Sequence, residues 1–157
     1  MNFRRFQQSD LLQIVTLFYE TVHSINRLDY TQAQVDAWAP INEKEAKMCA
    51  WKDSLNRNIT YVAEENEEVV GFSDMTYDGH LDRLYIHKNY QRQGIAAALV
   101  GILELEATKL NHTEIHTEAS ITAKTFFERM GYVVMETQNV ELKGVQLPNF
   151  KMMKKLM

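Results

Sequence analysis

Apolar residues recur at two different spacings along the chain, and the change of spacing separates helical from extended segments. Between residues 11 and 22 they follow a period of about 3.6 residues, which predicts an amphipathic helix. Two further helices are expected, one in TQAQVDAWA with Thr31 as its cap and Pro40 after its end, and one over residues 43–55. A short strand, residues 3–6, precedes this helical region.

The rest of the chain reads as strands alternating with helices. The runs ITYVAEE and EVVGFSDMTYD form a predicted hairpin, and HLDRLYIH is the next strand. A helix over residues 95–110, the strand EIHTEAS, a short helix over 122–130 and two closing strands over 132–142 and 147–153 follow. This order predicts a mixed α/β (α+β) fold around a central sheet. No repeat or Pro/Gly/Ser-rich linker divides the chain, so residues 1–157 are expected to form a single domain.

The charge and cysteine content narrow the classes of partner. A net charge of −4 disfavours nucleic acid, which binds a basic surface. A lone cysteine, Cys49, cannot form an internal disulfide or a CxxC site, and no metal is expected. No apolar run approaches the roughly 20 residues of a membrane span, and the N-terminus lacks the apolar core of a secretion signal. We therefore expect a cytoplasmic protein without a membrane or nucleic-acid partner, either a monomer or a homodimer.

The segment NYQRQGIAAALV joins a predicted strand to a predicted helix. The first amides of a helix are unpaired and carry a partial positive charge, so anions bind there. A glycine such as Gly94 lets the backbone approach an anion closely, and Arg92 adds a forked donor. The segment is typical of a phosphate site, although a solvated helix cap has the same composition. The nucleotide-binding patterns GxxxxGK[ST] and GxGxxG are both absent.

Two motifs resemble those of the GNAT superfamily of acetyl-CoA-dependent N-acetyltransferases. Gln91-Arg92-Gln93-Gly94-Ile95-Ala96 is similar to that family's Q/R-x-x-G-x-G/A pattern. Downstream, residues 120–132 resemble its A-x-x-F-Y-x-x-x-G-F segment. The resemblance implies a GNAT-like, mostly antiparallel sheet flanked by helices, with the fourth and fifth strands splayed apart. It also implies acetyl-CoA as cosubstrate and a primary amine, in a small molecule or a peptide, as acceptor.

The resemblance assigns the coenzyme to three groups of residues. The pyrophosphate is expected on the loop and first helical turn, at Gln91, Arg92, Gln93, Gly94, Ile95 and Ala96. The pantetheine arm is expected along the main chain of Leu84, Tyr85 and Ile86. Three further side chains complete the coenzyme site: Ser120 at the end of the fifth strand, and Ala123 and Phe126 after it.

The same resemblance implies an acidic residue that removes the proton of the attacking amine. Asp82 is the first choice, and strand alternation predicts that it shares a face with Leu84 and Ile86. Its alternative is a surface carboxylate paired with Arg83 or Lys88. Glu118 and His116, on the fifth strand, are the other candidates for the base.

The family commonly has a tyrosine as general acid where this chain has Phe127, which cannot donate a proton. This departure keeps open a second hypothesis, a catalytically weak acyl-CoA-binding module. A nucleotide-binding domain that uses the same helix N-terminus is a third. By family topology, the acceptor side would be formed by residues of the N-terminal helical region: His23, Tyr30 and Trp38.

Overall fold

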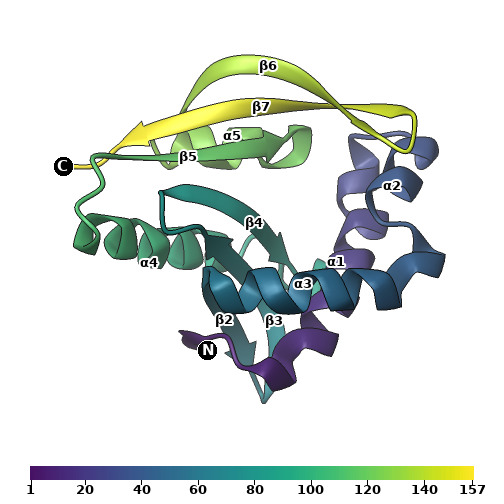
Figure 1. The fold of residues 1–157 in the computed structure, drawn as a ribbon, viewed down its shortest axis with the longest axis horizontal. Coiled ribbons are helices and arrows are strands. Elements are labelled where there is room, and N and C mark those ends of the chain that lie inside the picture. Colours follow the sequence, from purple (N-terminus) through teal and green to yellow (C-terminus); the bar gives the residue numbers. More distant parts are fainter.

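The computed structural model describes all residues, 1–157. Its helices and strands alternate in nearly the predicted order (Figure 1). The helices are α1 (Leu11–Ser24), α2 (Gln32–Trp38), α3 (Lys44–Arg57), α4 (Ile95–Lys109) and α5 (Ile121–Arg129). The strands are β1 (Asn2–Arg5), β2 (Ile59–Glu65), β3 (Glu68–Met75), β4 (His80–Ile86), β5 (Glu114–Ser120), β6 (Val133–Leu142) and β7 (Val145–Lys155).

One seven-stranded sheet runs through the molecule in the order β1-β2-β3-β4-β5-β7-β6. All neighbouring strands are antiparallel except β4 and β5, which are parallel. The predicted mixed fold with a mostly antiparallel sheet is therefore confirmed.

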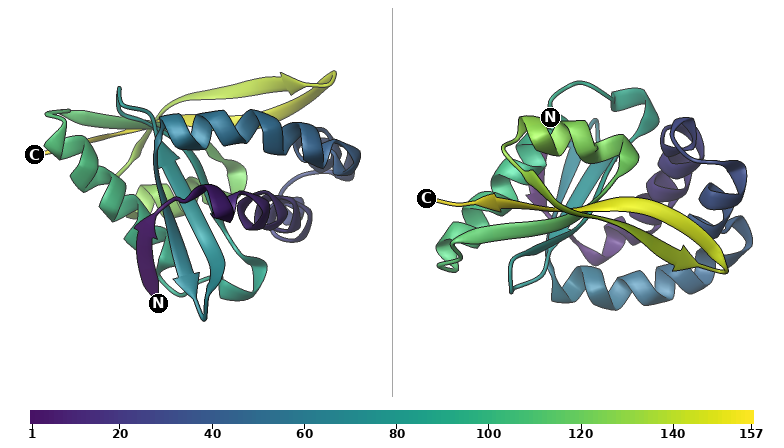
Figure 2. Two further views of the ribbon diagram at one scale, coloured as in Figure 1. Left: turned by 60° about the horizontal axis from the view of Figure 1, so that its bottom comes forward. Right: turned by 90° about the horizontal axis from the view of Figure 1, so that it is seen from above.

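The sheet opens between β4 and β5. These strands pair only through His80 with His116 and Leu81 with Thr117. Beyond that point β5, β6 and β7 lean away from β1–β4, and the two parts of the sheet diverge (Figure 2). The predicted splay of the fourth and fifth strands is present, and it leaves one edge of β4 without a neighbouring strand.

Helices cover both faces of the sheet. Side chains of α1 and α3, including Phe18 and Leu55, pack with β2 and β3 on one face. On the other face, Leu103 of α4 and Phe127 of α5 share a core cluster with Leu81. Each face of the sheet therefore has its own buried core.

A β-bulge at Asp82 changes the pattern of faces along β4. Asp74 pairs with Arg83 but the next residue, Met75, pairs with Leu81, so Asp82 is an extra residue in β4. Leu84 and Ile86 pack toward α4, whereas Tyr85 packs with the α1 core. The prediction that Asp82 shares a face with Leu84 and Ile86 is therefore wrong, because simple alternation does not hold across a bulge.

The last strand begins earlier than predicted. β7 starts at Val145 and contains Pro148, which lies opposite Asn139 of β6. The pairing of β7 with β5 ends at Asn149, so at Pro148 only one neighbouring strand remains. Proline is tolerated there because its missing N–H faces no partner strand. The β6–β7 hairpin thus extends past β5 toward α2 (Figure 1).

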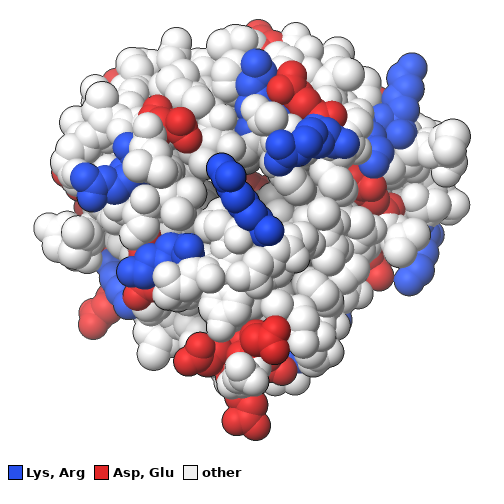
Figure 3. Space-filling model, turned by 180° about the vertical axis from the view of Figure 1, so that it is seen from behind, with Lys and Arg blue, Asp and Glu red and all other residues white.

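The surface carries charges of both signs. On the face seen from behind, Lys and Arg side chains are separated by uncharged residues, and no continuous basic surface is seen (Figure 3). Carboxylates gather at the lower end of this view, where Figure 1 places the turn between β2 and β3. None of the helices combines the length and the apolar character needed to cross a bilayer.

Candidate functional site

The loop between β4 and α4 has an unusual backbone. Arg92 and Gly94 both have a positive φ, of 60° and 80°. The loop is fastened from its start, because the Gln91 Nε2 atom donates to the Ile86 carbonyl oxygen at 2.7 Å. Ile95, the first residue of α4, is buried against Leu99 in the core. The loop is thus fixed at both ends while Arg92, Gln93 and Gly94 are exposed.

The backbone amides of this loop have no protein acceptor. Among the main-chain hydrogen bonds outside helices and strands, the first donated in this region is that of Ala98 to the Gly94 carbonyl, at 3.1 Å. The amides of residues 92–97 therefore face outward at the positive end of α4. A Cβ atom on Gly94 would meet no atom within 4 Å, so the space above it is open. An anion such as a pyrophosphate fits this arrangement.

The free edge of β4 presents main-chain groups beside this loop. The His87 amide donates to Val70 of β3 at 2.8 Å. Alternate residues of an antiparallel strand turn their main-chain groups to the same side, so Tyr85 also faces β3. Leu84 and Ile86 turn theirs toward the open edge, where the Ile86 carbonyl already accepts from Gln91. The main chain of Tyr85 therefore does not face the space between β4 and β5, but its side chain does.

The start of α5 lies across this space from β4. Ser120 caps the helix, since its Oγ accepts from the Ala123 amide at 3.1 Å. Ala123 and Phe126 are half-buried and pack on the same core cluster as Leu84. Phe127 is buried, with its ring centroid 5.0 Å from that of Tyr132. Phe127 is therefore a core residue, whereas Ala123 and Phe126 remain half-buried at the edge of that core.

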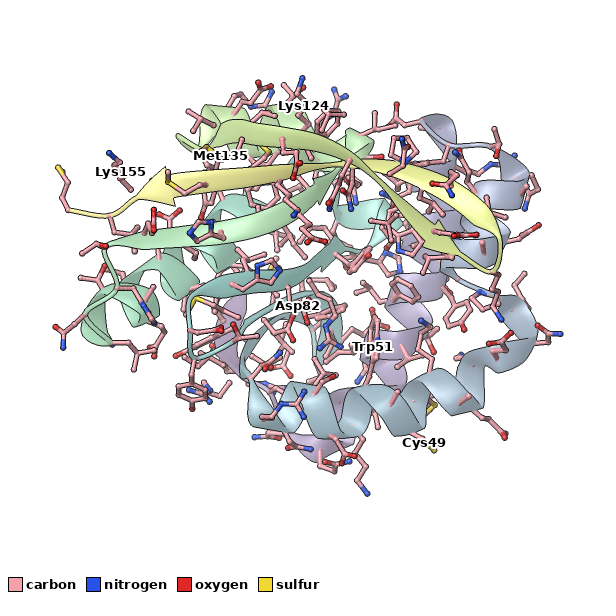
Figure 4. The ribbon with its side chains drawn as sticks, turned by 45° about the horizontal axis from the view of Figure 1, so that its top comes forward. Cys49, Trp51, Asp82, Lys124, Met135 and Lys155 are labelled. Atoms are coloured by element: carbon pink, nitrogen blue, oxygen red, sulfur yellow. The ribbon has the colours of Figure 1, made fainter.

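A cavity of about 170 Å³ lies where β4 and β5 separate, and we call it the strand-gap cavity. Asp82 of β4 and Glu118 of β5 both line it, and Figure 4 shows Asp82 between β4 and α3. Its other walls come from α2, from the preceding loop and from the β6–β7 hairpin. These walls include Tyr30, Trp38, Leu142 and Leu147, and Tyr85 of β4 and Ser120 of β5 also line the cavity.

Two of the predicted catalytic and acceptor residues lie outside the strand-gap cavity. His116 is half-exposed on the same face of β5 as Glu118, but it does not line the cavity, and its Nε2 lies 3.5 Å from a carboxylate oxygen of Glu114. His23 is hydrogen-bonded through Nε2 to the Ala39 carbonyl oxygen at 2.8 Å, which ties the end of α1 to the end of α2. The structure therefore brings Asp82 and Glu118 together with Tyr30 and Trp38, but not with either histidine.

The hydroxyl of Tyr30 is already engaged with the main chain. It donates to the Pro148 carbonyl oxygen at 2.7 Å and accepts from the Ile121 amide at 2.9 Å. Burial raises the pKa of Tyr30, and burial raises the pKa of Tyr85 far more strongly. Both phenols remain protonated at neutral pH. Of the two, Tyr30 has a hydroxyl that is hydrogen-bonded to two main-chain groups.

A buried ion pair joins β4 to β3. The Arg83 Nη2 atom lies 2.9 Å from Asp74 Oδ2 and 3.3 Å from Asp82 Oδ2. Asn58 donates to the same Asp74 oxygen at 2.9 Å. Burial raises the pKa of Asp74 to about 6, and the positive charge of Arg83 opposes this rise. Arg83 therefore connects the core to Asp82.

A second depression, which we call the aromatic groove, adjoins the strand-gap cavity. It has a volume of about 420 Å³, and both hollows are lined by Trp38, Asp82 and Tyr85. Trp51 points from α3 toward this region (Figure 4). Sequence reasoning did not predict that Lys47, Trp51 and Arg83 line a site. The spacing of residues within α3 gives no signal of which surface the helix will face across the sheet.

Comparison with known proteins agrees with the fold. The sequence model of the acetyltransferase (GNAT) domain matches residues 26–156. The uncharacterized N-acetyltransferase YafP of Escherichia coli K12 is 34% identical over 149 residues, covering 95% of this chain and 92% of that protein.

Solved structures show the same architecture. A GCN5-related N-acetyltransferase from Rhodopseudomonas palustris superposes with a TM-score of 0.91 at 28% identity, covering 99% of this chain and 95% of that one. The PaiA N-acetyltransferase of Thermoplasma acidophilum, solved with coenzyme A, has a TM-score of 0.80 at 17% identity, covering 99% and 98%. Together with the family match, these likenesses establish that the chain belongs to the GNAT family and is an acetyltransferase.

Proposed function

We propose that the protein transfers an acetyl group from acetyl-CoA to a primary amine of a small molecule or peptide, by direct attack of the amine on the thioester. The observation that carries this proposal is the strand-gap cavity, which places Asp82 and Glu118 at the point where β4 loses its neighbour. The unpaired amides of the α4 loop lie at the other end of the same open edge.

The coenzyme would be held by the loop and by the free edge. The amides of residues 92–97 and the guanidinium of Arg92 suit its pyrophosphate. The main chain of Leu84 suits the amides of the pantetheine arm, which would extend the sheet as an added strand. In support, the Thermoplasma structure contains coenzyme A, and a Salmonella typhimurium relative, 18% identical with a TM-score of 0.71, was solved with acetyl-CoA.

The chain's own groups would move two protons. Asp82 accepts the proton of the amine, directly or through water, because it is the carboxylate on the strand that faces the thioester. Glu118 lines the opposite wall and holds the amine in place. Main-chain N–H groups at the free edge of β4 stabilise the oxyanion that forms on the acetyl carbonyl.

Tyr85 is our candidate for the group that donates the second proton, to the departing thiolate. Phe127 is buried and has no proton to give, whereas the Tyr85 side chain lines the strand-gap cavity. The phenol is protonated at neutral pH and can donate to the departing thiolate, but burial raises its pKa and so makes it a weaker acid than an exposed tyrosine. The thiol of the product has a pKa of about 8.5 and leaves readily, so the expected contribution of Tyr85 is modest.

A catalytically weak acyl-CoA-binding module is the second candidate. The specific observation in its favour is that Phe127 packs in the core where the family pattern has tyrosine. Such a module would bind acetyl-CoA through the same loop but would not release coenzyme A when an amine is added.

Calorimetric titration with acetyl-CoA, with ATP and NAD as controls, tests the coenzyme. Micromolar binding of acetyl-CoA alone supports both candidates, and binding of ATP or NAD instead contradicts them. Release of coenzyme A with a panel of primary amines then separates them. Turnover with at least one amine supports the acetyltransferase, whereas tight binding with no turnover across the panel supports the module.

A further inference from the structure

The aromatic groove has a composition unlike that of the strand-gap cavity. Four aromatic rings line it, from α1, α2, α3 and β4: Phe18, Trp38, Trp51 and Tyr85. The polar side chains of the strand-gap cavity include the carboxylates Asp82 and Glu118. Those of the groove include two cations, Lys47 and Arg83. Since Trp38, Asp82 and Tyr85 line both hollows, one molecule can occupy them together.

The charge of Arg83 is balanced within the protein. Its guanidinium pairs with Asp74 at 2.9 Å and with Asp82 at 3.3 Å, and it lies over the Trp51 ring at 4.7 Å. Its side chain is only 10% exposed. Two carboxylates therefore offset the charge of Arg83, although its Nε and Nη1 atoms donate to no protein acceptor, and its side chain lines the groove beside Trp51.

The charge of Lys47 is not balanced in the same way. Its Nζ lies 5.1 Å from the centre of the Phe18 ring and 5.4 Å from that of Trp51, with no carboxylate within salt-bridge distance. The nearby carboxylate of Glu43 is bound to Lys143 instead. Burial lowers the pKa of Lys47, and the charge of Arg83 lowers it further. The Lys47 ammonium group thus lines the groove beside two aromatic rings and is paired with no carboxylate.

We propose that the acceptor is a primary amine joined through a flat, apolar body to an anionic group, and that Lys47 binds this anionic group. The amine lies beside Asp82 and Glu118, the body lies against Trp38 and Tyr85, and the anion completes the coordination of the Lys47 ammonium. Opposite charges at the two ends of one groove would align the molecule with its amine toward the thioester. This inference rests on the proposed function, which it extends from any primary amine to one class of acceptor.

Two acceptors that differ only in their anionic group test the contribution of that charge. The compounds 4-(aminomethyl)benzoate and 4-(aminomethyl)benzamide have the same shape, and only the first carries an anion. A charge-assisted hydrogen bond in a partly buried site contributes about 1.5–3 kcal/mol, so kcat/KM for the benzoate is expected to exceed that for the benzamide by about tenfold or more. Lys47→Met should remove this preference, while Lys52→Met, at an exposed position of the same helix, should keep it.

A binding measurement tests the groove without turnover. 4-Methylbenzoate lacks the amine, and its affinity should fall about tenfold in Lys47→Met and stay unchanged in Lys52→Met. Equal affinity for the wild type and Lys47→Met overturns the assignment of the anion to Lys47. If that result accompanies normal acetylation of other amines, the proposed function stands and only the acceptor class is wrong. If acetyl-CoA itself does not bind, the proposed function fails, and the 4-methylbenzoate measurement still decides the groove.

Discussion

Asp82 and Glu118 each come directly after the last pair of residues that joins β4 to β5, Leu81 and Thr117. The two carboxylates line one cavity because the strands that carry them stop pairing at that point. The separation of the strands therefore also determines where the two carboxylates lie.

Replacement of Asp82 by asparagine tests its role as the base. Because general-base catalysis contributes about 10² to 10⁴-fold, kcat of Asp82→Asn should fall by about 10²-fold. The defect should be largest at low pH, where the acceptor amine is protonated, and should shrink as the pH approaches the pKa of the amine, about 10. Steady-state rates from pH 6 upward, with the acetyl-CoA affinity measured separately, provide the test.

Glu118→Gln and His116→Gln serve as comparisons for that experiment. Glu118→Gln should raise KM for the amine more than it lowers kcat, because Glu118 lines the wall of the cavity opposite Asp82. His116→Gln should behave like the wild type, since His116 is half-exposed outside the cavity. A wild-type pH–rate profile in Asp82→Asn would remove this residue from the mechanism.

Gly94→Asp should abolish binding of acetyl-CoA while leaving the fold intact. Its φ of 80° is tolerated by aspartate at a cost of about 1 kcal/mol, and the space around its Cβ is empty. The new carboxylate would, however, stand where the pyrophosphate is expected. Gly144→Asp is the matched control, because Gly144 also has a positive φ, of 76°, and open space, but lies in the β6–β7 turn. Equal loss of acetyl-CoA affinity in both variants would argue against the loop as the coenzyme site.

The buried carboxylate of Asp74 gives a pH signature in stability. Its pKa in the folded protein is about 6, against about 3.9 in an unfolded chain. Between these values the folded state binds the extra proton, so the stability contributed by protonated Asp74 is lost as the pH rises. The free energy of unfolding of the wild type, minus that of Asp74→Asn, should therefore fall from pH 4 to pH 6 and level off above about pH 7. Urea denaturation of both proteins across this range would reveal the opposite sign if Asp74 were ionised more easily in the folded state.

Two tyrosines that line the strand-gap cavity should respond differently to loss of the hydroxyl. Tyr30→Phe leaves the Pro148 carbonyl and the Ile121 amide without their partner, and should lower the free energy of unfolding by about 1–3 kcal/mol. Tyr85→Phe should change stability less and should lower kcat, if its phenol donates to the thiolate. Thermal denaturation and kcat measured on both variants separate the two roles; an unchanged kcat in Tyr85→Phe would leave the thiolate to depart without this acid.

The sequence predicts the elements well where periodicity is local. The α4 helix was expected over residues 95–110 and spans Ile95–Lys109, and the cap at Thr31 is present, with its Oγ accepting from Gln34 at 3.2 Å. The loop motif also identified the exposed amides, because a helix N-terminus and its glycine are adjacent in the chain. The aromatic groove could not be predicted in this way, since Lys47 and Trp51 meet Tyr85 only through the packing of α3 on a distant strand.

The bulge at Asp82 has a consequence for the comparison of relatives. One additional residue in β4 exchanges the inward and outward positions for everything before it, while leaving the residues after it in place. A relative that lacked this residue would bring a different side chain to the same spot even if its sequence were otherwise identical. Positions around Asp82 should therefore be matched between family members by their cross-strand partners in β3, because a match of letters alone would equate residues that face opposite sides.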